Sequence, residues 1–191
     1  MLSKLTNKYF IYKNRFLFKQ KGVSYGKQLM AMGPTHLLIR GTLNIGDHCN
    51  IISGRMQNVL SRNLKTGIRV DNGAKVTIGD HVGMSCVCIW SAESVVIGDH
   101  VKLGAGVIIF DSDMHSLDFM NRRTIATDAP NAKVSPITIG NDVFVGAQSV
   151  ITKGVSIGDR SIVAVGSVVT KSIPADEIWG GNPAQFIKSL I

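Results

Sequence analysis

IGNDVF VGAQSV ITKGVS IGDRSI VAVGSV VTKSIP is the sequence of residues 139–174, divided every six residues. Each hexad opens with an aliphatic residue, its second place usually holds Gly or another small residue, and its fifth place is usually small or β-branched. A period of six fits neither an α-helix nor the two-residue alternation of a simple hairpin. It predicts a short strand and a turn, three per coil, stacked as a parallel solenoid whose coils lie about 4.8 Å apart.

The same pattern recurs along most of the chain. Five similar segments contain the pair Ile-Gly: LNIGDH (43–48), VTIGDH (76–81), VVIGDH (95–100), ITIGND (137–142) and VSIGDR (155–160). Their isoleucines are 33, 19, 42 and 18 residues apart, which an 18-residue coil with insertions explains. An ordinary β-sandwich with coincidental glycines is disfavoured, because the phase is kept over nine hexads broken by one insertion.

The positive charge is concentrated in one part of the chain. Residues 1–46 hold eight Lys or Arg and no acidic residue, whereas residues 47–191 hold thirteen basic and thirteen acidic residues. This argues against nucleic-acid binding by the main body and leaves a basic N-terminal face for an acidic partner. The three cysteines favour free thiols over a disulfide framework or a zinc site. We expect neither a signal peptide nor a transmembrane segment.

Residues from about 70 to 188 resemble the hexapeptide-repeat acyltransferases, and the match includes the G-N-P-A turn at 181–184. The most similar members are sugar O-acetyltransferases of the maltose and galactoside type and relatives that acetylate surface polysaccharides. The resemblance implies an all-β, left-handed parallel β-helix, acetyl coenzyme A as co-substrate, and a homotrimer with active sites between subunits. The handedness comes from the resemblance alone, since spacing cannot give it.

We expect three parts in the chain. Residues 1–30 form a basic N-terminal arm or helix, residues 31–178 form the β-helix with a loop inserted near 115–134, and residues 179–191 form a turn and a short helix. TNKYFIYKNRFLFKQKG (6–22) alternates aromatic residues with cations. Residues 1–28 could therefore lie on anionic lipid or pack on a neighbouring subunit, and packing is favoured because many family members carry a packing N-terminal helix.

The regular pattern stops at FDSDMHSLDF (110–119). The coil that begins at Ile97 completes three hexads at Met114, so His115 stands where the next corner would fall. It lies at the root of a loop of about twenty residues, and loops of that length in compact repeats are usually functional or disordered. Apolar residues in the loop favour an ordered lid.

His115 is the candidate catalytic base. Transfer of an acetyl group from a thioester to a sugar hydroxyl needs a base near neutral pH, and histidine is the side chain suited to that range. H-S-L-D at 115–118 and D-S-D-M-H at 111–115 are similar to motifs around the base in the family. We expect Nε2 to take the hydroxyl proton as the oxygen attacks the thioester directly, with a backbone N–H stabilising the oxyanion.

Four further side chains are expected around His115 and the acceptor. Asp111, Asp113 and His115 would share one face of a strand. Asp113 is the first candidate to orient the imidazole, and Asp111 is the second and a candidate acceptor contact; both aspartates could instead cap a turn. Arg122 resembles an arginine of the family loop, which implies a contact with the acceptor or with a neighbouring subunit. Sugar acetyltransferases often carry an asparagine facing the base, and Ser85 is the candidate substitute in GMSCVCIW (83–90).

The resemblance places coenzyme A along the C-terminal coils, in a groove between two subunits. The matching positions are Phe144, Gly146, Ala147, Val165, Gly166, Thr170, Lys171 and Lys188. Small corner residues would let backbone amides approach the pantetheine, and cations would meet the phosphates. The small residues could equally serve only the hexad pattern.

The sequence therefore favours a cytoplasmic, acetyl-CoA-dependent O-acetyltransferase acting on a sugar in surface polysaccharide biosynthesis, able to contact the inner face of the membrane. The alternatives are an N-acetyltransferase on an amino sugar, a serine acetyltransferase, a non-catalytic scaffold and a metal-dependent hydratase. No metal site is expected, because the three-histidine zinc site of the family's hydratases needs a closely spaced pair besides His81 or His100, and residues 101–191 offer only His115. His48, His81 and His100 occupy equivalent turns and predict an exposed stack.

Overall fold

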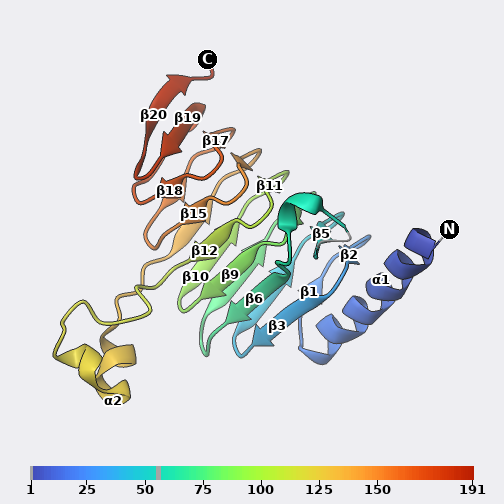
Figure 1. The fold of residues 1–191 in the computed structure, drawn as a ribbon, viewed down its shortest axis with the longest axis horizontal. Helices are drawn as coiled ribbons and strands as arrows, with labels where there is room; N and C mark the ends of the chain where they lie inside the picture. Colours follow the sequence, from blue (N-terminus) through green and yellow to red (C-terminus); the bar gives the residue numbers. More distant parts are fainter. Residues whose placement is uncertain (1, 55–56) are drawn as a thin grey trace.

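The computed structural model describes residues 2–54 and 57–191, whose strands form three sheets wound around one axis (Figure 1). Each coil contributes one short strand to each sheet in turn, and strands from successive coils pair in parallel. The all-β parallel solenoid that the period of six predicts is confirmed.

The strands are distributed over sheets A, B and C. Sheet A contains β1 (Ser24–Tyr25), β4 (Thr42–Ile45), β7 (Lys75–Ile78), β10 (Ser94–Ile97), β13 (Ile137–Ile139) and β16 (Ser156–Ile157). Sheet B contains β2 (Met30–Met32), β5 (Asn50–Ile52), β8 (Gly83–Ser85), β11 (Lys102–Leu103), β14 (Phe144–Val145), β17 (Ile162–Val163), β19 (Glu177–Gly181) and β20 (Ala184–Ser189). Sheet C contains β3 (Thr35–Ile39), β6 (Thr66–Val70), β9 (Cys88–Ser91), β12 (Ile108–Phe110), β15 (Val150–Ile151) and β18 (Val168–Val169).

The aliphatic residues that open the hexads form the core. The isoleucines of the five Ile-Gly pairs face one another on neighbouring strands of sheet A, and all are buried: Ile45, Ile78, Ile97, Ile139 and Ile157. One stack of this kind lines the interior of each sheet, so the hydrophobic core runs the length of the solenoid.

Glycine follows each of these isoleucines because the coils approach closely there. A Cβ atom on Gly79 would lie 2.3 Å from Asp99 Oδ1 and 2.8 Å from the carbonyl carbon of Gly98 on the next coil. The carboxylates also connect the coils, since Asp99 Oδ1 accepts a hydrogen bond from the backbone N–H of Asp80 at 2.7 Å. The pair Gly-Asp thus joins one corner of each coil to the next.

The histidines that follow Ile-Gly-Asp form the predicted stack. His48, His81 and His100 have positive φ angles of 56°, 58° and 60°. Their exposed rings lie 4.8 Å and 4.7 Å apart between centroids and are parallel within 3°. Among the described residues, no group of three His, Cys, Asp or Glu side chains is arranged to hold a metal ion.

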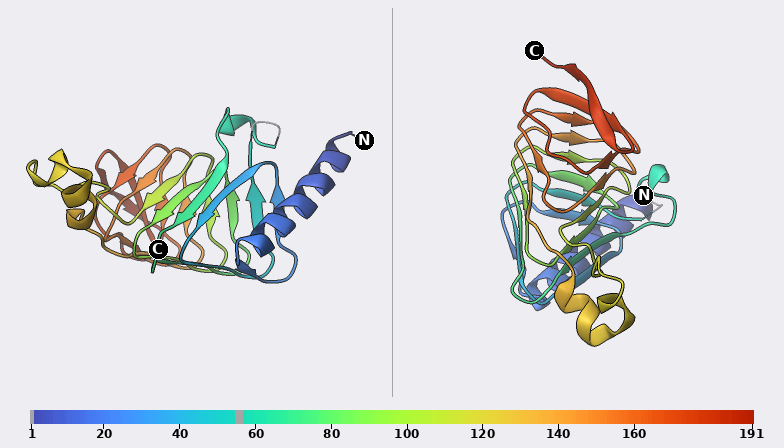
Figure 2. Two further views of the ribbon diagram at one scale, coloured as in Figure 1. Left: turned by 90° about the horizontal axis from the view of Figure 1, so that it is seen from below. Right: turned by 90° about the vertical axis from the view of Figure 1, so that its left-hand side faces the viewer.

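Helix α1 (Leu2–Gln20) lies across the first coil and packs on β2 of its own chain (Figure 2). The Phe18 side chain of this helix is fully buried in the hydrophobic core. Asn14 Nδ2 donates to the carbonyl oxygens of Ala31 at 2.9 Å and Gly33 at 2.8 Å. In the part of the chain that the structure describes, no helix has the length and apolar character needed to cross a membrane.

Two boundaries differ from those expected. The first coil starts at Ser24, within the segment assigned to the N-terminal arm. The short helix expected in 179–191 is wrong, because β19 and β20 form an antiparallel hairpin. β19 continues sheet B by pairing in parallel with β17. The backbone N–H and C=O groups at the edge of β17 need hydrogen-bond partners, and this segment supplies them by forming a strand.

Two insertions leave the coils. The first follows β5 and contains the 3₁₀ helix η1 (Val59–Ser61). The second follows β12 and contains η2 (Asn121–Arg123), α2 (Ile125–Asp128) and η3 (Ala129–Asn131). The second insertion projects away from the coils at the lower left of Figure 1.

Candidate active site

His115 lies at the root of the second insertion, where the chain turns from sheet C toward sheet A. We call this edge of the solenoid the C–A corner. The His115 side chain is 69% exposed, and its Nδ1 lies 2.6 Å from Oδ2 of Asp128 in α2. The backbone N–H of Ser116 donates to the other oxygen of Asp128 at 2.7 Å. Asp128 therefore holds both the imidazole and the backbone beside it.

The contact with Asp128 determines the tautomer of His115. The hydrogen bond from His115, followed by that from the Ser116 N–H, lowers the pKa of the Asp128 carboxyl below its usual value. An ionised carboxylate can only accept, so Nδ1 of His115 carries the proton and donates it. In its neutral form, the ring then presents Nε2 as an acceptor on its exposed side, as a general base requires.

Asp113 does not orient His115, contrary to the sequence expectation. Its Oδ1 forms an ion pair with Lys153 Nζ at 2.9 Å, and its backbone N–H donates to the carbonyl oxygen of Lys133. The strand geometry assumed for 111–115 is wrong, because β12 ends at Phe110 and Met114 has a φ of 63°. Asp113 instead ties the root of the loop to the neighbouring coil.

Asp111 is a structural residue in this arrangement. It is fully buried, and its carboxylate accepts hydrogen bonds from Ser91 Oγ at 2.7 Å, Ala92 N at 2.6 Å and Glu93 N at 3.0 Å. With both oxygens occupied by its own chain, Asp111 is not placed to contact an acceptor. The contacts of Asp111 support the alternative interpretation, in which this aspartate caps a turn.

Arg122 shapes the loop. Its Nη1 donates to the carbonyl oxygens of Ser116 at 2.6 Å and Leu117 at 2.9 Å, directly beyond His115. The loop is ordered by these polar contacts rather than by apolar anchors, since Leu117 and Phe119 are 65% and 60% exposed. Arg122 therefore acts on the site by holding the backbone next to the histidine.

Ser85 ends β8 at the corner between sheets B and C, which we call the B–C corner. Its Oγ accepts a hydrogen bond from Nδ2 of Asn58 at 2.8 Å. Asn58 also caps η1, because its Oδ1 accepts from the N–H of Leu60. Sequence reasoning missed Asn58, although the 15 extra residues between Ile45 and Ile78 marked the insertion that carries it.

Five of the residues matched to coenzyme A contacts lie together at the B–C corner. A Cβ atom on Gly146 would lie 2.5 Å from the backbone nitrogen of Val165, so the coils touch backbone to backbone there. The N–H of Gly166 donates to the carbonyl of Ala147 at 2.9 Å, and Gly166 has a φ of 70°. Phe144 and Val165 are exposed beside this corner. Gly146 is buried by this contact, whereas Gly166 is exposed and has nothing within 4 Å of its Cβ position, so an extended chain of amides can approach the corner at Gly166.

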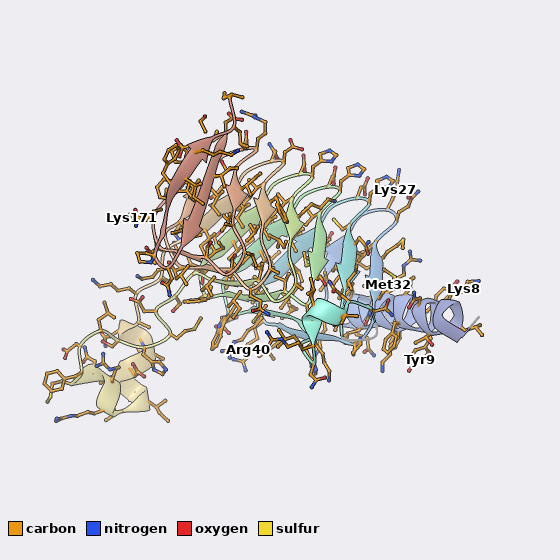
Figure 3. All side chains as sticks on the ribbon, turned by 45° about the horizontal axis from the view of Figure 1, so that its top comes forward. Lys8, Tyr9, Lys27, Met32, Arg40 and Lys171 are labelled. Atoms are coloured by element: carbon orange, nitrogen blue, oxygen red, sulfur yellow. The ribbon has the colours of Figure 1, made fainter. Side chains whose placement is uncertain are left out.

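The remaining three predicted donor residues lie elsewhere. Thr170 and Lys171 follow β18 and are exposed at the C–A corner, and Lys171 is labelled in Figure 3. Lys188 lies in β20, where it faces Ile178 of β19. The hairpin brings Lys188 to the C-terminal end of the coils without placing it beside Gly146.

His115 and the B–C corner occupy different edges of the solenoid. The strands of sheet C run between them, because Gly146 precedes β15 and His115 follows β12. Within one chain, the candidate base and the candidate donor surface are therefore separated by the width of sheet C.

Comparison with known proteins identifies the repeat. Residues 75–111 and 136–171 match the family described as the hexapeptide repeat of succinyl-transferase. The chain is 47% identical over 55 residues to a galactoside O-acetyltransferase of Escherichia coli, covering 29% of this chain and 27% of that protein. It is 34% identical over 121 residues to a putative acetyltransferase of Saccharomyces cerevisiae, covering 63% and 59%. It is 35% identical over 91 residues to a tetrahydropyridine-dicarboxylate N-acetyltransferase of Staphylococcus aureus, covering 48% and 31%.

Each match thus spans less than two thirds of the relative's length, whereas the solved structures match along the whole chain. A hexapeptide-repeat acetyltransferase of Vibrio cholerae in complex with acetyl coenzyme A is 27% identical with a TM-score of 0.56, covering 100% of this chain and 84% of that one. A maltose O-acetyltransferase of Clostridium difficile is 25% identical with a TM-score of 0.56, covering 100% and 85%. The solenoid is accordingly a left-handed β-helix, and residues 75–111 and 136–171 carry the hexapeptide repeat described for that family.

Proposed function

We propose that this protein transfers the acetyl group of acetyl coenzyme A to a hydroxyl group of a sugar. The observation that carries the proposal is the hydrogen bond between His115 Nδ1 and Asp128, which leaves Nε2 of the exposed ring available to an acceptor. A relative that acetylates galactosides and a solved relative that binds acetyl coenzyme A support the reaction class.

In this mechanism Nε2 of His115 takes the proton of the acceptor hydroxyl. The hydroxyl oxygen attacks the thioester carbonyl, the C–S bond breaks, and the imidazolium returns its proton to the leaving thiolate. Asp128 keeps its negative charge throughout and stabilises the imidazolium. Every proton taken from the acceptor is thus returned to the sulfur, and no further reactant is needed.

The B–C corner is the proposed donor surface. Gly166 is exposed with nothing within 4 Å of its Cβ position, which leaves room for a pantetheine arm, and the exposed Phe144 and Val165 can pack along it. Thr170, Lys171 and Lys188 would meet the nucleotide end. Ser85 and Asn58 lie on the same corner, with Ser85 two coils before Gly146, and their hydroxyl and amide groups are the proposed contacts to the acceptor.

The site needs a second copy of the chain. Since His115 and the B–C corner lie on different edges, a homotrimer with parallel axes would bring the C–A corner of one subunit to the B–C corner of the next. We therefore propose the trimeric arrangement, with each site shared by two subunits and Arg122 close to the neighbouring surface.

The proposed acceptor belongs to a surface polysaccharide or its precursor. The D-x-D-x-H pattern at 111–115, which resembles that of polysaccharide-acetylating relatives, supports this choice. The reaction would take place in the cytoplasm, where acetyl coenzyme A is made. An amino sugar or serine is the competing acceptor class, which the N-acetyltransferase relative supports.

Replacement of His115 tests the proposal. His115→Ala is expected to lower kcat at least about a hundredfold with the acceptor that the intact protein prefers, because a general base contributes about that much. Release of the coenzyme A thiol is measured with a panel of maltose, galactosides, amino sugars and serine. His100→Ala removes another exposed imidazole as the matched control and is expected to keep full activity.

Two results would contradict the proposal. Full activity of His115→Ala would exclude the histidine as the base. Faster turnover of amino sugars or serine than of any sugar hydroxyl would replace O-acetylation by the competing class.

A further inference from the structure

Helix α1 carries apolar side chains on the side that faces away from the coils. Leu5, Tyr9, Tyr12 and Phe16 are 63%, 58%, 70% and 63% exposed. Their spacing of four, three and four residues places them in one line, within about 60° around the helix axis at 100° per residue. We call these four residues the outer stripe. Asn14 and Phe18, which hold the helix on the first coil, lie on the opposite side.

The outer stripe is not required for folding. The buried face of α1 is already satisfied by Phe18 in the core and by Asn14 on two backbone carbonyl oxygens. Four large apolar side chains in a row on an exposed helix are uncommon in a monomer and mark a contact with a partner. The remaining question is the chemistry of that partner.

The charges around the outer stripe indicate an anionic partner. Helix α1 contains no acidic residue. Lys8 and Lys19 lie along one border of the stripe and Lys13 lies along the other, and all three side chains are exposed. Lys13 Nζ lies 5.6 Å from the centre of the Tyr9 ring. Figure 3 shows Lys8 and Tyr9 on the part of α1 that extends past the coils.

A second copy of this chain does not match those charges. Pairing two outer stripes would bring the lysines of both helices together with no acidic residue on either helix to offset them. Residues 21–46 add three basic residues and no acidic one, and residues 47–191 carry equal numbers of acidic and basic residues. An apolar row flanked by lysines is instead typical of helices that lie in the interface of a negatively charged bilayer.

We propose that α1 binds the surface of an anionic lipid bilayer through its outer stripe, while its opposite face remains on the first coil. Aromatic and leucine side chains enter the boundary between head groups and acyl chains, and the lysines contact the lipid phosphates. The loop that carries His115 projects away from the part of the molecule that α1 covers (Figure 1). The inference is independent of the proposed acetyl transfer.

Vesicle co-sedimentation with the full chain tests the proposal. Vesicles of phosphatidylcholine with a quarter of phosphatidylglycerol are expected to bind the protein at least about tenfold more strongly than pure phosphatidylcholine, and salt is expected to weaken this binding. The triple variant Lys8→Gln, Lys13→Gln, Lys19→Gln is expected to lose at least about tenfold in affinity. The control Lys75→Gln, Lys102→Gln, Lys133→Gln removes the same charge from exposed positions outside α1 and is expected to bind as the intact protein does.

A second variant tests the apolar part of the contact. Tyr9→Ser, Tyr12→Ser, Phe16→Ser is expected to abolish vesicle binding while the thermal unfolding midpoint and the mass in solution stay unchanged, because these side chains are exposed. The proposal is overturned if the intact protein does not bind anionic vesicles, or if both triple variants bind as well as it does. A changed mass of this variant in solution would also overturn it, by showing that another subunit covers the stripe.

Discussion

His115 has one ring nitrogen held and one free, and this asymmetry comes from a single carboxylate. Asp128 accepts from Nδ1 at 2.6 Å and from the Ser116 N–H at 2.7 Å, so it fixes the ring relative to the backbone from which it projects. A residue thirteen positions away thereby sets the tautomer of the candidate base.

Replacement of Asp128 is expected to affect the reaction rather than the binding of the donor. Asp128→Asn should lower kcat at least about tenfold and leave the KM for acetyl coenzyme A little changed, because an amide does not stabilise the imidazolium as a carboxylate does. For the same reason the acidic limb of the pH–rate profile should move to lower pH. Steady-state kinetics across pH measure both effects.

Asp118→Asn is the matched control for this prediction. Asp118 lies in the same loop, and its side chain accepts a hydrogen bond from the N–H of Met120. Its replacement should leave kcat and the pH profile unchanged. The pKa of the Asp128 carboxyl is lowered, so the stabilisation from its contact with His115 is complete above the usual carboxyl pKa and is lost as pH falls from there through the lowered pKa. The contact should therefore persist in assays near neutral pH. Equal effects of the two substitutions would contradict a specific role for Asp128.

The position of His115 could be predicted from the sequence, and its partner could not. Because the corners of a regular coil recur every six residues, the hexads show where a coil should turn and which residue lies at that corner. Asp128 lies in an insertion without periodicity, and its distance from His115 depends on the path of α2. The assignment of Asp113 failed for the same reason, since it assumed a strand that had ended at Phe110.

At the scale of the strand and turn, the small second residue of the hexad is set by the approach of the coils. Gly79→Ala should lower the free energy of unfolding by about 1–3 kcal/mol, because the new Cβ would meet Asp99 Oδ1 at 2.3 Å and the backbone of Gly98 at 2.8 Å. Urea unfolding at one protein concentration measures the change.

Gly67→Ala is the control for the same chemical change. Gly67 lies in β6, where a Cβ atom would have nothing within 4 Å, and its φ is not in the left-handed region. Its replacement should leave the free energy of unfolding unchanged or raise it slightly, since alanine loses less backbone entropy on folding. A cost equal to that of Gly79→Ala would show that the close approach of the coils is not the cause.

The elements could be predicted wherever the period of six is continuous. Between residues 137 and 169 each hexad contributes one short strand, which ends at the aliphatic residue that opens the hexad. The segment 179–191 has no hexads, and its state is set by β17, which offers an edge that a strand can extend. A free sheet edge is a tertiary feature, so local sequence patterns did not reveal the hairpin.

For the whole molecule, α1 completes one end of the hydrophobic core. Phe18→Ala should lower the free energy of unfolding by about 3–5 kcal/mol, because its ring is fully buried against the first coil. Phe16→Ala removes the same ring from the opposite, exposed side of the helix and should leave stability unchanged. Equal losses in thermal or urea unfolding would contradict the orientation of α1.

The concentration of charge in residues 1–46 was visible from the sequence, but its arrangement was not. Composition shows only that the segment is basic. The structure divides α1 into a face that holds the coil and a face that carries the outer stripe, because the helix packs on its own chain. The same residues thus contribute to the fold and to a surface.

The hydrogen bonds of Asn14 and Arg15 limit the assembly of the solenoid with other molecules. Their side chains donate to the carbonyl oxygens of Leu29, Ala31 and Gly33, which lie in β2 and beside it at the open edge of sheet B. An open parallel edge can accept a strand from another molecule, and repeated addition at that edge would produce a growing fibre. Because α1 occupies these acceptors, a strand of another molecule cannot pair with β2. The solenoid therefore does not extend into a filament at this end.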